Sequence, residues 1–309
     1  MLSGVLIANP KATTTHHRAP ETVAVPLTDE LKFDIAWTRY RGHAQEIAAS
    51  ARRDGLDVVV VIGGDGTVNE AVNGLLEGGP AHDVPNLAVI PGGSTNVFAR
   101  AVGINRNQEH ASRQIAEALR LRRRRVIGLG HLDDRWFTFT AGLGLDAEVV
   151  AAVEARRAGG RRSTPWLYLR STLEQYVAGT DRRHPALTLH RPGRDPVTGL
   201  YLALIGNTSP WTFLRHRRVD PFPGATFDTG LDVLGLASLR LMPTLRTAAQ
   251  LLHDDGRVPT GRGVHHDHDL GRFTVTADRP VACQVDGDWI GLRETVTVTA
   301  VPRALSVVV

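Results

Sequence analysis

A run of β-branched residues closes the segment Asp57–Ile62, and the glycine-rich sequence Gly63-Gly64-Asp65-Gly66-Thr67 follows at once. Such a run is typical of a parallel strand that is buried on both faces. The next segment, Thr67–Leu76, has helical spacing, with Val68, Ala71, Val72 and Leu75 on one side. The order of strand, glycine loop and helix therefore predicts a βα unit of a parallel sheet.

The same alternation runs through the first 125 residues of the 309-residue chain. Further strands are expected at Gly4–Ala8, Phe33–Thr38 and Leu87–Ile90, and further helices at Ala44–Arg53, Val97–Val102 and Glu109–Leu121. A chain of this length predicts two domains rather than one. We expect the first to be an α/β domain with a parallel sheet over residues 1–125.

The pattern changes near Arg125, where short strand-like segments separated by turn residues take over. They lie at Trp136–Ala141, Ala186–Leu189, Leu200–Ile205, Leu231–Leu239, Phe273–Ala277 and Thr295–Val301. This pattern predicts an antiparallel β domain over residues 126–300, interrupted by one helical stretch, Trp166–Val177. The Gly- and His-rich segment Val258–Leu270 reads as a loop. Residues 301–309 contain the apolar run Ala304–Val309, which we expect to be a terminal strand that can pair with the sheet of either domain, including the first.

Composition narrows the classes of protein to consider. No stretch approaches the roughly 20 apolar residues that a bilayer-spanning helix needs, and no basic segment precedes the apolar residues at the N-terminus. Cys283 is the only cysteine, so an intrachain disulfide is excluded. We therefore expect a cytoplasmic protein.

Arginine supplies nearly all the positive charge of a chain with a formal net charge of +4. The arginines cluster at Arg120 and Arg122–Arg125, at Arg156, Arg157, Arg161 and Arg162, and at Arg215, Arg217 and Arg218. Genomic usage bias predicts the same excess without any function. The clusters suit anionic lipid headgroups, and no aromatic residues or motifs of nucleic-acid binding accompany them. We expect a peripheral position at the inner membrane surface and no nucleic-acid partner.

The glycine loop after Asp57–Ile62 has the chemistry of a phosphate site. Three glycines allow a tight turn and bring backbone N–H groups close to phosphate oxygens, at the strand end where α/β sheets bind ligands. The carboxylate of Asp65 and a phosphate are both negatively charged, so a cation is expected between them, and this suggests Mg²⁺. The loop lacks the Gly-Lys-Ser/Thr of a Walker A motif and the glycine spacing of a dinucleotide fingerprint. A tight turn without a ligand is the alternative.

A second glycine loop, Pro91–Asn96, also follows a predicted buried strand and precedes a predicted helix. Two such loops at neighbouring strand ends are suited to enclose one triphosphate.

These motifs resemble the diacylglycerol kinase catalytic family, which includes bacterial soluble lipid kinases and sphingosine kinases. The resemblance rests on Gly63–Glu70 and Pro91–Asn96 with Asn9-Pro10 upstream. It continues in order along the chain through Thr38, Gly42–Ala44, Gly142–Ala147, Gly206-Asn207, Asp228–Asp232 and Asp286–Asp288. It implies an N-terminal nucleotide-binding domain and a C-terminal β-sandwich, with ATP and lipid meeting in the cleft between them.

The resemblance also implies site residues. The nucleotide-binding set is Asn9, Pro10, Lys11, Thr38, Gly63, Gly64, Asp65, Gly66, Thr67, Val68, Asn69, Glu70, Gly93, Ser94, Thr95 and Asn96. Asp288 takes the position of the family's glutamate general base, one methylene shorter, with Asp65 as a second catalytic candidate. A base must come within hydrogen-bond reach of the hydroxyl that it deprotonates. A structural Mg²⁺ is expected on the side chains of Asp228 and Asp232 and the carbonyl of Leu231.

The chain departs from the family pattern at two acidic positions, where it has Val97 and Gly128. The segment Phe227–Asp232 is also one residue shorter than its family counterpart. Both differences put the arrangement of metal ions in question.

The leading hypothesis is an ATP- and Mg²⁺-dependent lipid kinase that phosphorylates diacylglycerol at a bilayer surface. A sphingoid-base or other lipid-alcohol kinase, an NAD kinase and a non-catalytic lipid-binding protein are the alternatives. The oligomeric state is open, and a homodimer is one option. Two further features have ordinary explanations: His265–Asp269 as solvated loop residues, and Trp166–Val177 as ordinary helix packing rather than a lipid channel.

Overall fold

The computed structural model describes residues 1–10, 12, 20–158, 184–214, 217–252 and 256–309. Lys11, the expected helix Trp166–Val177, and Arg161, Arg162 and Arg215 lie outside these described residues. The chain divides into two compact units. Unit 1 consists of Met1–Leu129 and Pro302–Val309, and unit 2 of Gly130–Val301.

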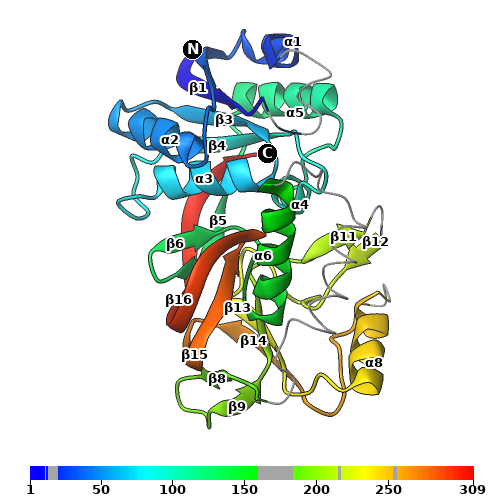
Figure 1. Ribbon diagram of the computed structural model, residues 1–309. Helices are drawn as coiled ribbons and strands as arrows, with labels where there is room; N and C mark the ends of the chain where they lie inside the picture. Colours follow the sequence, from blue (N-terminus) through cyan, green and yellow to red (C-terminus); the bar gives the residue numbers. More distant parts are fainter. Residues whose placement is uncertain (11, 13–19, 159–183, 215–216, 253–255) are drawn as a thin grey trace. The chain divides into compact units, whose positions relative to one another are not determined.

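Unit 1 is built on a parallel sheet (Figure 1). Its strands are β1 (Leu2–Ala8), β2 (Leu31–Trp37), β3 (Val58–Gly63), β4 (Asn86–Pro91) and the last part of β16 (Asp288–Val308). They lie in the order β2-β1-β3-β4-β16, and every neighbouring pair is parallel. Val58–Ile62 in β3 are at most 1% exposed, which confirms a strand buried on both faces.

Helices cover both faces of this sheet. They are α1 (Pro20–Ala24), the 3₁₀ turn η2 (Val25–Leu27), α2 (His43–Arg53), α3 (Asp65–Leu75), α4 (Val97–Ala101) and α5 (Gln108–Arg120). Figure 1 shows α2 and α3 on one face and α1 with α5 on the other. Helix α5 begins where the Asn107 side chain accepts hydrogen bonds from the N–H groups of Glu109 and His110. Helices α2 and α3 pack so closely that a side chain at Gly74 would collide with the carbonyl of Gln45.

Unit 2 is built on an antiparallel sheet in the order β14-β13-β10-β7-β15-β16. Two hairpins extend it: β5 pairs with β16 and with β6, and β8 pairs with β15 and with β9. The bounds are β5 (Arg124–Leu132), β6 (Arg135–Phe137), β7 (Thr140–Gly144), β8 (Leu187–His190), β9 (Val197–Leu200), β10 (Leu202–Gly206), β13 (Leu231–Leu236), β14 (Val264–Leu270) and β15 (Arg272–Val285). A separate short hairpin joins β11 (Thr212–Leu214) to β12 (Arg217–Val219).

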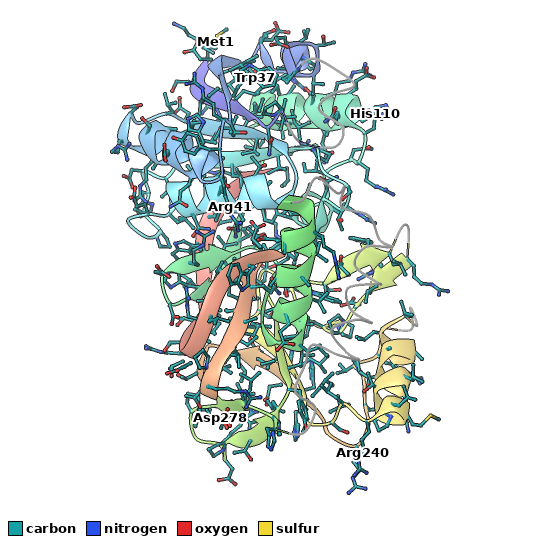
Figure 2. All side chains as sticks on the ribbon, viewed as in Figure 1. Met1, Trp37, Arg41, His110, Arg240 and Asp278 are labelled. Atoms are coloured by element: carbon teal, nitrogen blue, oxygen red, sulfur yellow. The ribbon has the colours of Figure 1, made fainter. Side chains whose placement is uncertain are left out.

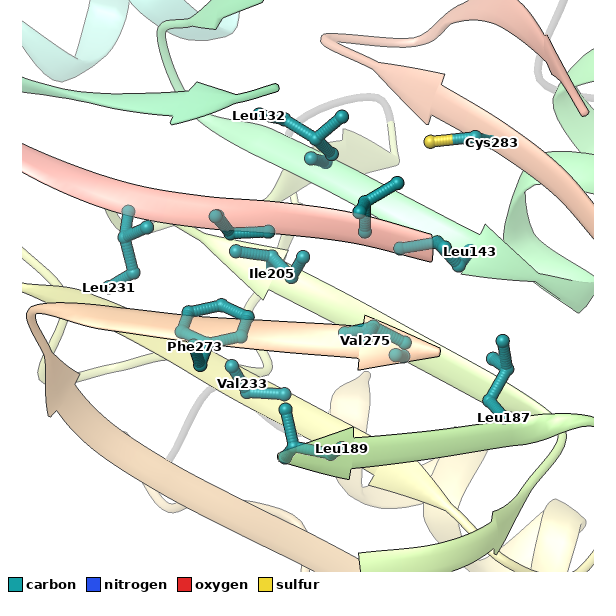
Figure 3. Packing of buried hydrophobic residues seen from close by; sticks show 14 of the residues in the cluster. Leu132, Leu143, Leu187, Leu189, Ile205, Leu231, Val233, Phe273, Val275 and Cys283 are labelled. Atoms are coloured by element: carbon teal, nitrogen blue, oxygen red, sulfur yellow. The ribbon is translucent and has the colours of Figure 1, made fainter. Parts of the chain in front are cut away.

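The core of unit 2 lies between these strands. Figure 3 shows Leu143, Ile205, Val233, Phe273 and Val275 pointing toward one another from β7, β10, β13 and β15. Cys283, the single thiol, is buried in the same core. The fold therefore combines a parallel α/β unit with an antiparallel unit, and this confirms the expected fold class.

Two helices of unit 2 did not appear in the expected pattern. Helix α6 (Leu145–Ala158) packs against β7, β10 and β15, and α8 (Leu241–Leu251) follows β13. The prediction of a loop over Val258–Leu270 was wrong for its second half, because Val264–Leu270 forms strand β14 paired with β13. Within the described part of the chain, no helix has both the length and the apolar character needed to cross a bilayer.

Candidate functional site

The carboxyl ends of β1 and β3 meet where the strand order of unit 1 reverses. The chain passes from β1 to β2 on one side, and β3 then pairs with β1 on the other. Open α/β sheets bind their ligands at such a switch point. Asn9 follows β1, and its Nδ2 donates a hydrogen bond to Thr67 Oγ1 at 2.9 Å. The first glycine loop therefore begins at the edge of the sheet where this architecture places ligands.

The two glycine loops pack backbone against backbone. The N–H of Gly92 donates to the carbonyl oxygen of Gly63 at 2.7 Å. A Cβ atom on Gly93 would lie 2.7 Å from the Cα of Gly64, and one on Gly92 would lie 3.0 Å from the Cα of Gly63. Side chains at these positions would force the loops apart, so glycine is required for their mutual contact as well as for any approach of a phosphate.

Asp65 joins the first loop to the second. Its Oδ2 accepts a hydrogen bond from the N–H of Val97 at 3.0 Å, and its Oδ1 accepts one from the N–H of Phe98 at 3.1 Å. These are the first two N–H groups of α4, which the helix itself leaves unpaired. Asp65 therefore caps α4, and its charge is stabilised by amide groups that sequence reasoning did not connect with it.

Asn96 closes the second loop on itself. Its Oδ1 accepts from the N–H of Gly93 at 2.8 Å, and its Nδ2 donates to the carbonyl of Gly93 at 2.7 Å. Its φ of 49° lies in the left-handed region, which asparagine tolerates better than most residues. Ser94 is left exposed at the tip of this loop, and Thr95 is partly exposed beside it.

Glu70 supports the segment that follows β2. Its carboxylate accepts hydrogen bonds from the N–H of Gly42 at 2.8 Å and from the N–H of Ala44 at 3.2 Å. Gly42 has a φ of 89° and is the residue before α2. Glu70 thus caps α2 and fixes the course of the chain after Thr38, whose N–H donates to the Ala8 carbonyl at 2.9 Å.

The structure brings most of the predicted nucleotide-binding residues to one edge of the sheet in unit 1. Those at the carboxyl ends of the strands are Asn9, Pro10, Thr38, Gly63, Gly64, Asp65, Gly66, Gly93, Ser94, Thr95 and Asn96. The side chains of Val68 and Asn69 point inward and are at most 2% exposed. Nucleotide binding by this set stays a prediction.

In unit 2, Asp286 and Gly287 form the turn between β15 and β16. Both have positive φ, 48° and 81°, as a two-residue type I′ hairpin turn requires, and Asp-Gly is a favoured sequence for it. The Asp286 carboxylate accepts hydrogen bonds from the N–H groups of Thr138, Phe139 and Thr140 and from the Thr138 hydroxyl, at 2.7–3.0 Å. The first aspartate of the predicted catalytic motif is therefore an anchor for the turn.

Burial raises the pKa of the Asp286 carboxyl above its ordinary value, and its four hydrogen bonds act in the opposite sense. Asp288, the predicted base, is the first residue of β16 and pairs with Val285 across the turn. It is partly exposed, whereas Asp286 is buried. Of the two aspartates in the motif, Asp288 is the one that is not buried.

Gln284 connects this turn to the start of α6. Its Oε1 accepts from the N–H of Gly287 at 2.9 Å, and its Nε2 donates to Asp146 Oδ2 at 2.8 Å. The carboxyl group of Asp146 is enclosed although the residue as a whole is partly exposed, and this burial raises its pKa to about 6. Asp146 lies in the family-like segment Gly142–Ala147, but no sequence signal marked Gln284.

Asp232 is fully buried between two histidines of β14. Its Oδ1 accepts from the N–H of Asp269 at 3.2 Å and lies 2.7 Å from Nδ1 of His268. Its Oδ2 lies 3.7 Å from Nε2 of His266. The expected loop is a strand, and both His266 and His268 approach Asp232. His268 is nevertheless exposed, as the sequence predicted.

The opposite face of β14 carries another buried acid. Asp267 is 7% exposed and lies 2.8 Å from Arg191 and 2.7 Å from Arg194. The alternating polar residues of β14 are therefore held from both sides by partners distant in the sequence.

The residues predicted for a structural Mg²⁺ do not fit that ion. Mg²⁺ prefers six oxygen ligands in octahedral geometry, whereas one oxygen of Asp232 is taken by an imidazole and a backbone amide. Asp228, the other side chain predicted as a ligand, is exposed. Among the described residues, no group of three or more His, Cys, Asp or Glu side chains is arranged to hold a metal.

Comparison with known proteins agrees with this geometry. Residues 3–127 match the family profile of the diacylglycerol kinase catalytic domain. The diacylglycerol kinase of Bacillus subtilis strain 168 is 36% identical over 119 residues, which cover 38% of this chain and 37% of that protein. A lipid kinase candidate of Streptococcus pneumoniae is 33% identical over 111 residues, 36% of this chain and 35% of its own. Each alignment thus spans little more than a third of the relative.

The fold is shared along nearly the whole chain. A solved structure from Bacillus anthracis, described as that of a diacylglycerol kinase candidate, covers 99% of this chain and 96% of its own with a TM-score of 0.74 at 19% identity. A second structure from the same organism, described as that of a diacylglycerol kinase, has a TM-score of 0.68 at 18% identity. The expected resemblance to the diacylglycerol kinase catalytic family is therefore confirmed over residues 3–127.

Proposed function

We propose that this chain is an ATP-dependent lipid kinase that transfers the γ-phosphoryl group of ATP to the free hydroxyl of diacylglycerol. The observation that carries the proposal is the contact between the two glycine loops at the switch point of unit 1. The first loop leads into the N-terminus of α3, and the second presents the exposed Ser94 at the same carboxyl edge of the sheet, which is the kind of position where phosphates bind. The match of residues 3–127 to a lipid-kinase family supports a phosphoryl donor at this edge.

The proposed reaction forms a bond between the lipid hydroxyl oxygen and the γ-phosphorus and breaks the bond from that phosphorus to the β,γ-bridging oxygen. ADP leaves with the bonding electrons, and the hydroxyl proton passes to Asp288. Backbone N–H groups of the two glycine loops would hold the phosphates, so the chain acts mainly by positioning and charge stabilisation. Mg²⁺ would enter as the counter-ion of ATP, neutralising charge on its phosphate oxygens.

We assign Asp288 as the base and Asp65 as a positioning residue. Both oxygens of Asp65 accept hydrogen bonds from the first two N–H groups of α4, so its carboxylate has a structural role in the loop. Asp288 follows the β15–β16 turn and is partly exposed. The turn anchored by Asp286 would hold it in place.

The test is transfer of labelled phosphate from ATP to diacylglycerol in mixed micelles with Mg²⁺. We expect transfer by the wild-type chain, and a loss of at least a hundredfold in kcat for Asp288→Asn. Asp278→Asn removes an exposed carboxylate from the adjoining strand β15 and should leave kcat unchanged.

Two results would contradict the proposal at different levels. Transfer that survives in Asp288→Asn would keep the kinase activity and move the base elsewhere. Absence of transfer to diacylglycerol by a folded protein that binds ATP would overturn the assigned acceptor. Sphingosine and NAD would then be tested in the same assay.

A further inference from the structure

Helix α8 turns its apolar side chains toward solvent. Leu241, Met242 and Leu245 are 58%, 74% and 55% exposed, and Leu252, the residue that ends the helix, is 37% exposed. At 3.6 residues per turn these four positions fall within about 100° of the helix circumference. They therefore form one continuous stripe, which we call the α8 stripe.

The most buried position of α8 is polar. Thr247 is 5% exposed and is the one fully buried residue of this helix. Its hydroxyl donates to the carbonyl of Pro243 at 3.1 Å, and the Thr244 hydroxyl donates to the carbonyl of Arg240 at 2.8 Å. A surface helix of a soluble protein normally shows the reverse arrangement, with its apolar face inward. Packing against the described residues of unit 2 therefore does not account for the exposed Leu241, Met242 and Leu245.

Exposed apolar residues are concentrated at this helix. Twelve large hydrophobic residues of the described structure are exposed, and four of them lie within Leu241–Leu252. Single exposed hydrophobic residues are normal on any surface, but a contiguous group marks a binding surface.

The charges around the α8 stripe are positive. Arg240 and Arg246 are both exposed, and Figure 2 shows Arg240 projecting outward. The sequence has no acidic residue between Asp232 and Asp254. Asp254 and Asp255 follow the helix and lie outside the described residues. Arginine side chains beside an apolar stripe can reach lipid phosphates while the stripe enters the hydrocarbon boundary.

We propose that α8 is the membrane-docking element of this chain and that the α8 stripe inserts into the interface of an anionic lipid bilayer. The inference rests on the proposed lipid-kinase function, because an enzyme whose substrate stays in a bilayer must reach that bilayer. It names the surface by which this chain does so.

A second copy of this chain is a less suitable partner for the stripe. An 11-residue helix is only about 17 Å long, and one face of it is small beside the roughly 800 Å² per partner that a stable interface buries. An amphipathic helix that lies on a membrane needs only its own apolar face and flanking positive charge.

The test uses the full chain without ATP and vesicles of phosphatidylglycerol and phosphatidylcholine. We expect the wild-type chain to sediment with these vesicles, and the double variant Met242→Glu, Leu245→Glu to lose at least tenfold in partition coefficient. The matched control is Val25→Glu, at a residue that is 61% exposed in η2, and it should bind like wild type. Vesicles of phosphatidylcholine alone should bind the wild type more weakly, because they lack the anionic headgroup.

A fluorescence measurement tests the site directly. Cys283 is fully buried, and burial raises the pKa of its thiol to about 12. Met242→Cys can therefore be labelled selectively with a polarity-sensitive dye. Its emission should shift to the blue when vesicles are added, whereas the same dye on Val25→Cys should show no shift.

Unchanged vesicle binding by the double variant, or no shift at Met242→Cys, would overturn the inference. A wild-type dimer that the double variant converts to a monomer would also overturn it, in favour of self-association. Failure of the proposed function is separable: the double variant should still phosphorylate a short-chain diacylglycerol that is monomeric in solution. Vesicle binding through α8 with no transfer to any acceptor would leave the surface standing and reject the kinase.

Discussion

Gln284 couples Asp146 to the turn that precedes Asp288. Its amide donates to Asp146 Oδ2 at 2.8 Å and accepts from the N–H of Gly287 at 2.9 Å. Each half of one side chain thus satisfies a group on a different element, the start of α6 and the β15–β16 turn. Because Oε1 contacts Gly287 and Nε2 contacts Asp146, rotating or removing the Gln284 amide disturbs both hydrogen bonds together.

Replacing Gln284 by leucine should slow the reaction without weakening nucleotide binding. The Gly287 N–H would lose its partner, and the turn that carries the proposed base would be less well positioned. We expect kcat to fall by about ten- to a hundredfold with little change in the KM for ATP. Unfolding in urea should show a loss of about 1–3 kcal/mol, because Gly287 and Asp146 are left unpaired.

The matched variant Gln284→Glu separates positioning from a general loss of stability. Glutamate can still accept from Gly287, but it places a second carboxyl against Asp146. One of the two must be protonated for them to share a hydrogen bond. Activity of Gln284→Glu relative to wild type should therefore rise as pH falls toward 6, whereas a parallel pH profile would reject the coupling.

Asp146→Asn should stabilise the chain at neutral pH. Burial raises the folded-state pKa of Asp146 from its ordinary value of 3.8 to about 6, so the native state binds more protons than the unfolded state between these two pH values. Its contribution to the free energy of unfolding therefore falls as pH rises from about 4 to 6, and the loss is complete above that range. Asparagine preserves the acceptor for Gln284 without the buried charge.

Urea unfolding of wild type and Asp146→Asn across pH 4–8 checks this sign. The variant should gain about 1–3 kcal/mol at pH 7–8 and show little difference at pH 4. A gain that is constant across the whole range would mean that the Asp146 carboxyl is not protonated more readily in the folded state.

Asp65 offers a test between capping and catalysis. Asp65→Ala removes both acceptors from the first N–H groups of α4 and should cost about 1–2 kcal/mol of stability, as lost helix caps do. Asp65→Asn keeps one acceptor, so it should lose less stability and keep kcat within about tenfold, with a raised KM for ATP. Asp34→Ala, at an exposed acid of β2, is the control. Complete loss of transfer in a stable Asp65→Asn protein would make Asp65 a catalytic residue.

The parts of the fold that could be predicted from sequence are those with local signals. Val58–Ile62 and the glycines after it predict a strand and a tight turn within ten residues of chain, and the structure has both. The expected helix Val97–Val102 corresponds to α4 for the same reason. The sequence suggested a cation as the partner of Asp65 and did not indicate its hydrogen bonds to the N–H groups of Val97 and Phe98. Those residues lie 32 and 33 positions away in the sequence.

The features that were not predicted depend on distant partners or on an inverted pattern. The central residues of β14 are all polar, so the sequence does not indicate a strand. They are stabilised in the fold by Asp232 and Arg191, which lie 36 and 76 residues away from their partners in the sequence. Helix α8 was not predicted, and no local signal in the sequence shows that its apolar stripe faces solvent. Both the polar strand and the helix with an exposed apolar face depart from the rule that apolar side chains face the protein interior.

Gly93→Ala tests whether contact between the glycine loops is required for the site. The added Cβ would lie 2.7 Å from the Cα of Gly64 and 3.0 Å from Oδ1 of Asn96, and the first of these neighbours is backbone that cannot swing aside. We expect a loss of about 1–3 kcal/mol in the free energy of unfolding and a KM for ATP that rises at least tenfold. Gly78→Ala is the control, since its Cβ would meet only the flexible end of Arg52 at 3.6 Å. A Gly93→Ala protein with wild-type KM would show that phosphate binding does not depend on the close approach of the two loops.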